Sequence, residues 1–252
     1  MTQRRRQDLI LEKVQQAGFV TIDELVEHFK VTPQTIRRDL NQLANEKKLQ
    51  RHHGGAGVES STQNLAYQTR KIMELEAKEK IARELVKMIP DGASLFINIG
   101  TTTETIARAL LNHRDLRVVT NNLHVASILS VKEDFTVIVA GGEVRSRDGG
   151  IVGEATRDFI NQFQMDFGII GISGIHSDGT LLDYDYREVR VAQTIIANSR
   201  QVLLAADHTK FGRNAMVRLG SITQADHFFT DRRPTAEICQ LLTDNQVALH
   251  IV

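Results

Sequence analysis

The sequence predicts two domains of different class, an N-terminal winged helix-turn-helix domain and a C-terminal α/β domain with a mostly parallel sheet. In residues 1–57, three short helical patterns precede a glycine-rich hairpin. From about residue 67 to residue 252, short aliphatic runs alternate with helical patterns, which is typical of parallel strands joined by helices. Residues 58–66 lack periodicity, and we expect them to form a linker.

The helix signals of the first domain are explicit. Gly18 ends a first helix. Thr21 and Glu24 form a capping-box pattern that opens a second helix, and Thr32-Pro33 opens a third with proline at the first helical position. The apolar residues at helical spacing are Leu9, Ile10, Val14, Ile22, Leu25, Val26, Phe29, Ile36, Leu40 and Leu43. A short strand from Leu49 then leads into the hairpin.

The third helix carries the candidate DNA-reading side chains. With its apolar stripe turned inward, the polar residues left on the outer face and its flanks are Gln34, Thr35, Arg37, Arg38 and Asn41. Arginine, glutamine and asparagine offer paired hydrogen-bonding groups that match base edges in the major groove. The hairpin adds Arg51, His52 and His53, placed to lie along a phosphate backbone or minor groove. Taken alone, these residues also fit a solvated helix face and a surface turn.

In the second domain, strands and helices follow one another along the chain. The expected strands are 94–99, 117–120, 135–140, 167–173, 201–206, 227–230 and 248–252. The expected helices are 67–88, 102–112, 121–131, 153–163, 186–199 and 234–243. This alternation indicates crossover connections and therefore a mostly parallel sheet.

Polar, glycine-containing turns follow several of these strands. The residues concerned are Asn98, Gly100, Thr101, Thr102 and Thr103, then Asn121, then Gly141 and Gly142, and finally Lys210. Helix N-termini at such turns offer backbone N–H groups to an anion, and the carboxyl ends of parallel strands meet at the edge where open α/β sheets bind ligands. Each turn alone also fits an ordinary helix cap, but together they predict a phosphorylated small molecule as ligand. Neither a dinucleotide fingerprint nor a P-loop occurs, so we expect no cofactor.

Charge and composition agree with a cytoplasmic DNA-binding regulator. The net charge is zero, yet residues 1–57 hold ten Lys and Arg against seven Asp and Glu. No apolar run approaches the roughly 18 residues of a membrane span, and no signal-peptide pattern occurs at the start. The single cysteine, Cys239, can form neither an intramolecular disulfide nor a zinc site by itself, so no metal is expected.

The first domain closely resembles the signature of the DeoR family of bacterial regulators. The matching string is Glu24-Leu25, Phe29, Val31-Thr32, Thr35-Ile36-Arg37-Arg38-Asp39-Leu40, Leu43, Leu49 and Arg51-His52-His53-Gly54-Gly55-Ala56. Residues from about 67 onward look like the DeoR effector domain, which is similar in fold to ribose-5-phosphate isomerase and glucosamine-6-phosphate deaminase. The resemblance implies a transcription regulator that binds double-stranded operator DNA as a homo-oligomer, with a tetramer as the family's usual state.

Several stretches look closer to the DeoR members that control glycerol and glycerol 3-phosphate use. They include Val131-Lys132-Glu133-Asp134-Phe135, Arg145-Ser146-Arg147-Asp148-Gly149-Gly150 and Lys210-Phe211-Gly212-Arg213-Asn214-Ala215-Met216-Val217. This resemblance implies a repressor that glycerol 3-phosphate releases, and it places Glu188 and Lys210 near the effector. Asn98 stands where the family usually has aspartate; an uncharged amide can donate as well as accept, which leaves a different sugar phosphate open as the effector.

An enzyme is the alternative from another class. A sugar-phosphate isomerase or deaminase with a fused N-terminal module needs a base and an acid beside its substrate. The nominees are Asp148, Glu154, Asp185, Glu188 and Lys210, but spacing singles out no pair among them. Because an isomerase has no use for a recognition helix and wing, we expect no catalytic residues and no enzymatic activity.

Overall fold

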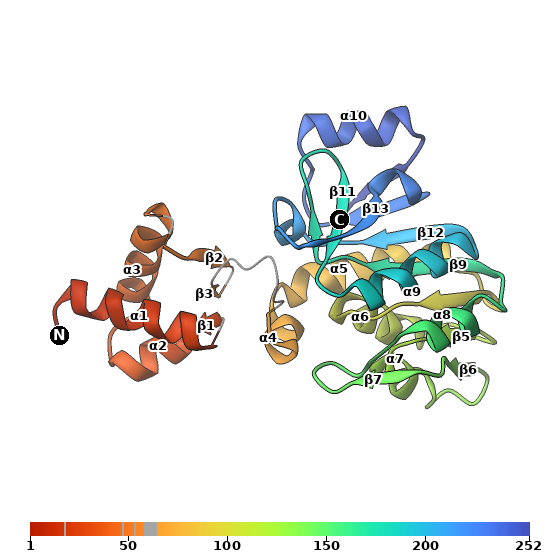
Figure 1. Cartoon of the computed structure of the whole chain (residues 1–252), viewed down its shortest axis with the longest axis horizontal. Coiled ribbons are helices and arrows are strands. Elements are labelled where there is room, and N and C mark those ends of the chain that lie inside the picture. Colours follow the sequence, from red (N-terminus) through yellow and green to blue (C-terminus); the bar gives the residue numbers. More distant parts are fainter. Residues whose placement is uncertain (18, 47, 53, 58–64) are drawn as a thin grey trace. The chain divides into compact units, whose positions relative to one another are not determined.

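The computed structural model describes residues 1–17, 19–46, 48–52, 54–57 and 65–252. These residues divide into two compact units, Met1–Met73 and Glu74–Val252, each with its own apolar core (Figure 1). His53 and residues 58–64 of the expected linker lie outside the described residues. Among the described residues, no helix is both long and apolar enough to cross a membrane.

The first unit is a winged helix-turn-helix, as predicted. Its first six elements are α1 (Gln3–Ala17), β1 (Phe19–Thr21), α2 (Ile22–Phe29), α3 (Pro33–Asn45), β2 (Gln50–His52) and β3 (Gly55–Gly57). The backbone N–H of Glu24 donates to Thr21 Oγ1 over 3.1 Å, and the Thr21 N–H donates to Glu24 Oε2 over 2.7 Å, so α2 begins at the expected capping box. Helix α3 begins after Thr32, with Pro33 in its first turn.

The strand β1 was not predicted. It pairs antiparallel with β3, which pairs in turn with β2. A side chain on Gly55 would place its Cβ 2.3 Å from the carbonyl oxygen of Val20, so this close approach of two strands requires glycine. Three residues without alternating polarity are too short a pattern to identify such a strand from sequence.

The helix expected over residues 67–88 is broken. It consists of α4 (Tyr67–Ile72), α5 (Leu75–Leu85) and a 3₁₀ turn (Val86–Met88). Met73 is extended and Glu74 has a left-handed backbone, with φ 50°, which interrupts the helical hydrogen bonds. The boundary between the two units falls at this break.

The second unit is built on a seven-stranded sheet in which every neighbouring pair is parallel. The strands are β4 (Ser94–Ile97), β5 (Arg117–Thr120), β6 (Thr136–Val139), β9 (Met165–Gly171), β12 (Ser199–Ala205), β14 (His227–Thr230) and β15 (Ala248–Ile251). Their order is β15-β14-β12-β9-β4-β5-β6. The chain therefore builds outward from β4 in one direction and from β9 in the other, which creates a switch point between β4 and β9.

Helices cover both faces of this sheet (Figure 1). One core cluster joins the strands to α5, α6 (Thr101–Leu110) and α7 (Leu123–Leu129), and the other joins them to α8 (Glu154–Ile160), α9 (Tyr186–Ala197) and α10 (Ala236–Asp244). The strands carry apolar side chains toward both layers, which explains their continuous aliphatic runs. The predicted α/β class is confirmed.

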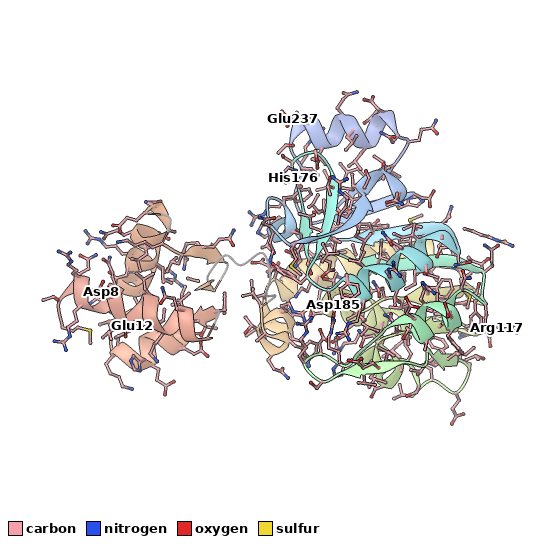
Figure 2. The ribbon with its side chains drawn as sticks, in the orientation of Figure 1. Asp8, Glu12, Arg117, His176, Asp185 and Glu237 are labelled. Atoms are coloured by element: carbon pink, nitrogen blue, oxygen red, sulfur yellow. The ribbon has the colours of Figure 1, made fainter. Side chains whose placement is uncertain are left out.

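Short antiparallel strands form within the loops that follow the carboxyl ends of the main-sheet strands. A hairpin is formed by β7 (Glu143–Arg145) and β8 (Gly150–Val152), and β10 (Gly174–Ile175), β11 (Thr180–Asp183) and β13 (Val217–Ser221) form a small sheet. None of these strands was predicted. Arg117 is the first residue of β5 and marks the amino-terminal end of the main-sheet strands. Asp185, in the loop before α9, lies well away from Arg117 (Figure 2).

Candidate DNA-binding surface and effector site

Helix α3 presents the predicted DNA-reading side chains on one face. Its inward residues Ile36, Leu40 and Leu43 are fully buried. The exposed residues are Gln34, Arg37, Arg38 and Asn41, while Thr35 is half-buried. The Thr35 N–H donates to Thr32 Oγ1 over 3.3 Å, and the two hydroxyls lie 2.9 Å apart, so Thr35 also helps to start the helix.

Arg51 of the wing lies close to α3. One of its guanidinium nitrogens, Nη1, donates to the Gly55 carbonyl over 3.0 Å, which fixes the arginine across the hairpin. Burial lowers the pKa of Arg51, and the positive charge of Arg37 lowers it further. Two cations held close enough to repel one another form a patch suited to a phosphate backbone. His52 belongs to β2, but its side chain is not among those described. His53 lies outside the described residues.

A buried ion pair fastens α3 to α1. Arg6 Nε lies 2.5 Å from Asp39 Oδ2, and the carboxylate is 1% exposed. Gln7 Nε2 donates to Asp39 Oδ1 and to Gln42 Oε1, at 3.5 and 3.0 Å. Asp39 lies three residues after Ile36, on the inward side of the helix, and no role was predicted for it from the sequence. The ion pair holds α3, with its outward arginines, against α1.

The structure leads to a direct expectation for Arg38. Replacing it with alanine removes an exposed guanidinium from the recognition face, and a lost bidentate base contact weakens binding by about 1–3 kcal/mol. Arg83→Ala, on the outer face of α5, removes the same charge elsewhere and should leave operator binding unchanged. Titration of operator and unrelated DNA at two salt concentrations measures both. Equal operator affinity for wild type and Arg38→Ala would remove Arg38 from the contact surface.

In the second unit, the turn after β4 buries a set of polar groups. Asn98 is 2% exposed, Gly100 has φ 152°, and Thr101, Thr102 and Thr103 begin α6 as buried residues. Thr103 Oγ1 donates to the Asn98 and Gly100 carbonyls, both at 2.7 Å, which shapes the turn. Asn98 Oδ1 has no hydrogen-bond partner among the described residues. A buried acceptor without a partner is costly unless a ligand supplies a donor.

The turns after β5 and β6 are fixed by neighbouring elements. Asn121 is fully buried, and its Nδ2 donates to the Ile151 carbonyl over 3.1 Å, while its Oδ1 has no partner within the described chain. Thr156 Oγ1 donates to the Gly141 carbonyl over 2.8 Å. A Cβ on Gly142 would lie 2.1 Å from that same hydroxyl oxygen. The Gly141-Gly142 turn is therefore fastened to α8, and Gly142 has a packing reason.

Lys210 and the Thr101 turn are linked through a buried lysine. Lys78 is 2% exposed, and its Nζ donates to Thr101 Oγ1 over 3.1 Å. Lys210 Nζ lies 3.9 Å from Asp207 Oδ2. Burial would raise the pKa of Asp207, but Lys210, the Thr209 hydroxyl and Lys78 together lower it below its usual value. The ends of β4 and β12, separated by β9, are thus bridged by charged side chains.

Lys78 was not predicted from the sequence as a residue of this edge. A signal was available, because residues 78, 81, 82 and 85 recur at helical spacing and the last three are the apolar Ile81, Ala82 and Leu85. A lysine on a buried stripe is rare unless its charge has a partner.

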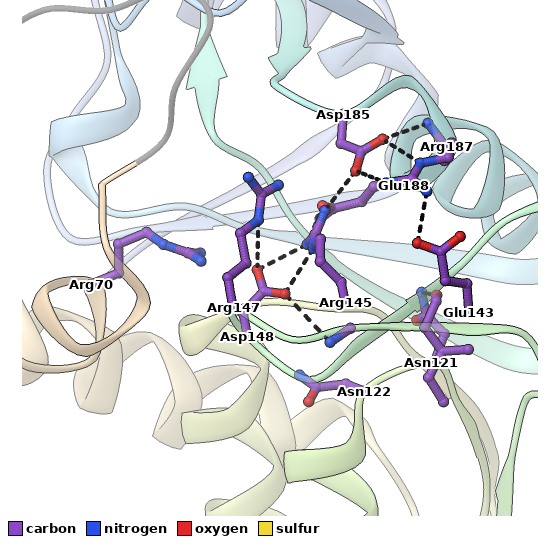
Figure 3. Close-up of polar contacts among 12 residues, drawn as sticks. Arg70, Asn121, Asn122, Glu143, Arg145, Arg147, Asp148, Asp185, Arg187 and Glu188 are labelled. Carbon is purple, nitrogen blue, oxygen red and sulfur yellow. Dashed lines mark hydrogen bonds and ion pairs between the residues drawn. The ribbon is translucent and has the colours of Figure 1, made fainter.

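Glu188 belongs to a second charged cluster, centred on Arg145. Arg145 Nε and Nη2 bind Asp148 at 2.8 and 2.9 Å, Nη1 binds Asp185 at 3.1 Å, and Nη2 binds Glu188 at 2.7 Å (Figure 3). Burial raises the pKa of Glu188 to about 8, with the negative charge of Asp183 adding and Arg145 opposing. For Arg145, burial alone would lower the pKa, but the charges of Glu188 and Asp148 outweigh it and raise the pKa.

This cluster fastens the β7–β8 hairpin to α9 over the carboxyl ends of the strands. The hairpin backbone also bonds to the β5 turn: the Ile151 N–H donates to the Asn121 carbonyl over 2.7 Å. Glu188 is therefore connected to the predicted effector site indirectly, through its contact with Arg145 and through the β7–β8 hairpin. Of the enzyme nominees, Asp148, Asp185 and Glu188 are bound to Arg145, and Glu154 pairs with Arg190 at 3.3 Å.

A recognition helix with a wing in one unit, and a buried polar edge of a parallel sheet in the other, define a DNA-binding transcription regulator with a small-molecule sensor domain. The chain belongs to the DeoR family: residues 6–62 match the DeoR-like helix-turn-helix domain and residues 73–232 match the DeoR C terminal sensor domain.

Three relatives that match over nearly the whole chain are named as repressors. The chain is 58% identical to the glycerol-3-phosphate regulon repressor of Escherichia coli (strain K12), over 100% of both chains. It is 53% identical to that of Haemophilus influenzae, over 93% of this chain and 91% of the relative. It is 41% identical to the repressor CsqR of Escherichia coli, over 99% and 95%. Ribose 5 phosphate isomerase A from Neisseria gonorrhoeae aligns in structure over 53% of this chain and 52% of its own, with 14% identity and a TM-score of 0.40.

Proposed function

We propose that the protein represses genes for glycerol and glycerol 3-phosphate use and that glycerol 3-phosphate releases it from its operator. The name and full-length coverage of the 58% identical relative support the regulon. The observation that carries the effector is the turn at Thr101, where hydroxyls and the start of α6 lie beside the lysines of the Asp207 cluster. A helix N-terminus with adjacent cations favours a phosphate group.

The neighbouring acceptors support a hydroxylated ligand. Asn98 Oδ1 and Asn121 Oδ1 are buried at the ends of adjacent strands and have no partner among the described residues. Hydroxyl groups of a polyol are donors that satisfy such oxygens. A phosphorylated polyol supplies an anion and donors together. Other sugar phosphates share this chemistry, so the choice among them rests on measurement.

Release from DNA requires that the ligand binds the DNA-free conformation more tightly than the operator-bound one. The decisive titration measures operator occupancy by the full-length protein against glycerol 3-phosphate, ribose 5-phosphate and glucosamine 6-phosphate. Release by the first at the lowest concentration supports the proposal, and release by another ester alone replaces the effector. We further propose a cytoplasmic homotetramer without catalytic activity. Turnover of any of the three esters, observed by NMR, would contradict the last point.

Lys210 is expected to decide induction. Hydrogen bonds to charged groups are worth about 1.5–3 kcal/mol, so Lys210→Ala should weaken effector binding roughly ten- to hundredfold. Because the N-terminal unit is unchanged, the variant should still bind operator DNA, but it should resist release by the effector. The matched control is Lys87→Ala, whose exposed ammonium pairs with Glu84 at 2.6 Å. Superimposable induction curves for wild type and Lys210→Ala would show that Lys210 is an ordinary loop residue.

A further inference from the structure

Arg4 is an exposed arginine whose guanidinium is not used by the fold. It forms no hydrogen bond or ion pair with any described residue, whereas Arg6, two residues along α1, is buried against Asp39. The first turn of α1 contains no acidic residue, and a positive charge at the start of a helix opposes the helix dipole. The stability of α1 therefore gives no reason for an arginine at this position.

Arg4 lies beside the recognition helix. Together with Gln42 it lines a polar crevice between α1 and the second half of α3. The side-chain amides of Gln3 and Gln7 both donate to Gln42 Oε1, at 3.1 and 3.0 Å, and hold the first turns of α1 against this part of α3. Gln42 comes four residues, about one helical turn, after Arg38. The crevice with Arg4 therefore adjoins the DNA-reading face.

The acidic residues of the crevice leave Arg4 unpaired. Glu46 Oε2 binds Lys48 Nζ at 2.7 Å, and this bond lowers the pKa of Glu46 below its usual value. Asp8 is exposed and lies one turn after Arg4, and the two form no ion pair. These four residues and Arg38, which we call the α1 flank, carry three positive and two negative charges. Positive charge is therefore in excess on this flank.

The wing and the α1 flank lie on two sides of the DNA-reading face. Arg37 is on the wing side, because its charge acts on Arg51 of the wing. Gln42 is on the side of α1, because it accepts the two amides of that helix. Five residues separate Arg37 from Gln42, which is about 140° around an α-helix. Arg38 and the other exposed DNA-reading residues of α3 fall within this arc.

A DNA duplex offers a phosphate backbone to each of these two sides. The major groove is about 12 Å wide, and an α-helix with its side chains is about 10–12 Å across, so a helix in the groove fills it from one backbone to the other. Each side of the recognition helix therefore faces a phosphate backbone. The wing with Arg51 accounts for only one of them.

We propose that Arg4 binds a phosphate of the second backbone and that the start of α1 belongs to the DNA-binding surface. Two observations support this partner: the α1 flank has an excess of positive charge, and it continues the DNA-reading face of α3. A phosphate contact fixes the position of α3 in the groove and carries no sequence information. Arg4 should therefore contribute equally to the affinity for every duplex.

Titrations of the full-length protein with mixed-sequence duplex DNA and with operator DNA, at a series of salt concentrations, test the contact. Each phosphate contact contributes about 0.9 to the slope of log K against log salt concentration. Arg4→Gln should reduce the magnitude of this slope by about one for each bound protomer and weaken binding to both DNAs alike, by roughly three- to tenfold at low salt. Arg4→Lys should keep the wild-type slope, because a point charge also binds a phosphate.

Arg5→Gln is the matched control. It removes the same charge from the next residue of α1, which is exposed, does not line the crevice and lies about 100° further around the helix. Its slope and its affinity should equal those of the wild type. Hydrogen exchange of the α1 amides shows for both variants whether the helix is intact.

A reduced slope in Arg4→Gln with unchanged exchange of α1 supports the proposal, and an unchanged slope overturns it. Equal losses in Arg4→Gln and Arg5→Gln also overturn it, because they reflect net charge and not a contact. A loss confined to operator DNA assigns Arg4 to base reading, and faster exchange of the α1 amides assigns it to the fold. Either of these results contradicts a phosphate contact.

Discussion

Asp39→Ala is expected to destabilise the N-terminal unit by about 3–5 kcal/mol and to abolish operator binding with it. Removing one partner of a buried pair leaves the other charge uncompensated, and Arg6 is only 8% exposed. Gln7 loses an acceptor at the same time. Because the free energy of unfolding of a small domain is only a few kcal/mol, the N-terminal unit should unfold while the sensor unit remains folded. Hydrogen exchange of α1 and α3 amides in the full-length protein measures this unit separately.

A double replacement distinguishes the ion pair from simple packing. In Arg6→Met/Asp39→Leu both charges are gone and apolar groups fill the space, so stability should return to within about 1–2 kcal/mol of wild type. The conservative control is Asp226→Asn, whose carboxylate accepts from the Val202 N–H in the sensor unit and lies outside the head. Unaltered exchange of α3 amides in Asp39→Ala would show that the pair contributes nothing to the fold.

The fold of the N-terminal unit could be predicted almost completely from the sequence, because the sequence patterns that indicate its helices are local. The capping box at Thr21, the N-terminal Thr32-Pro33 pair and the apolar stripe of α3 each depend on residues within one or two turns. The pairing of β1 with β3 depends on Phe19 and Gly57, far apart in sequence. No local pattern encodes such a contact.

The polar edge of the sheet was predictable in position and only partly in composition. Strand–turn–helix order placed Asn98, Thr101 and Asn121 at one sheet edge, because parallel strands carry their following turns to the same side. Lys78 comes from a helix that precedes the sheet, and Arg145 comes from a hairpin whose strands have three residues each. Their roles follow from burial, and burial of a charged residue is a tertiary property.

The glycines show the same limit. Gly141-Gly142 reads as a ligand cradle from sequence, whereas the structure gives Gly142 a steric reason, the hydroxyl of Thr156 at α8. The steric reason and a ligand role are compatible, so the glycines remain candidates of the predicted effector site.

Arg145→Met should destabilise the sensor unit by about 3–5 kcal/mol at pH 8 and by less at pH 5. In the wild type one guanidinium, 9% exposed at its side chain, serves Asp148, Asp185 and Glu188. Its loss removes the cation that Glu188 contacts and one of the cations at Asp148 and Asp185, which keep Arg147 at 3.9 Å and Arg187 at 3.3 Å. Lysine cannot replace it, because an ammonium lacks the planar set of donors that three carboxylates require here. Arg145→Lys is therefore expected to recover only part of the stability.

The pH dependence follows from Glu188. Its pKa rises from the usual 4.5 to about 8 in the folded protein, so between these values the folded state holds a proton that the unfolded state has lost. Wild-type stability should therefore fall as pH rises through this window, by at most about 1.4 kcal/mol per pH unit from this group. Arg145 opposes the rise in pKa, so its removal should extend the fall above pH 8.

Glu188→Gln supplies the matched control. The amide cannot titrate, so urea unfolding of this variant should vary less between pH 5 and 8 than that of the wild type. In Arg145→Met/Glu188→Gln one uncompensated carboxylate is absent, and part of the loss should be recovered at pH 8. The stability of the sensor unit is measured separately from that of the N-terminal unit. The protein is equilibrated in urea at each test pH, and the β9 peptides are then pulse-labelled by hydrogen exchange at one common labelling pH. A pH profile of Glu188→Gln that matches the wild type would show that Glu188 titrates normally and that the raised pKa is wrong.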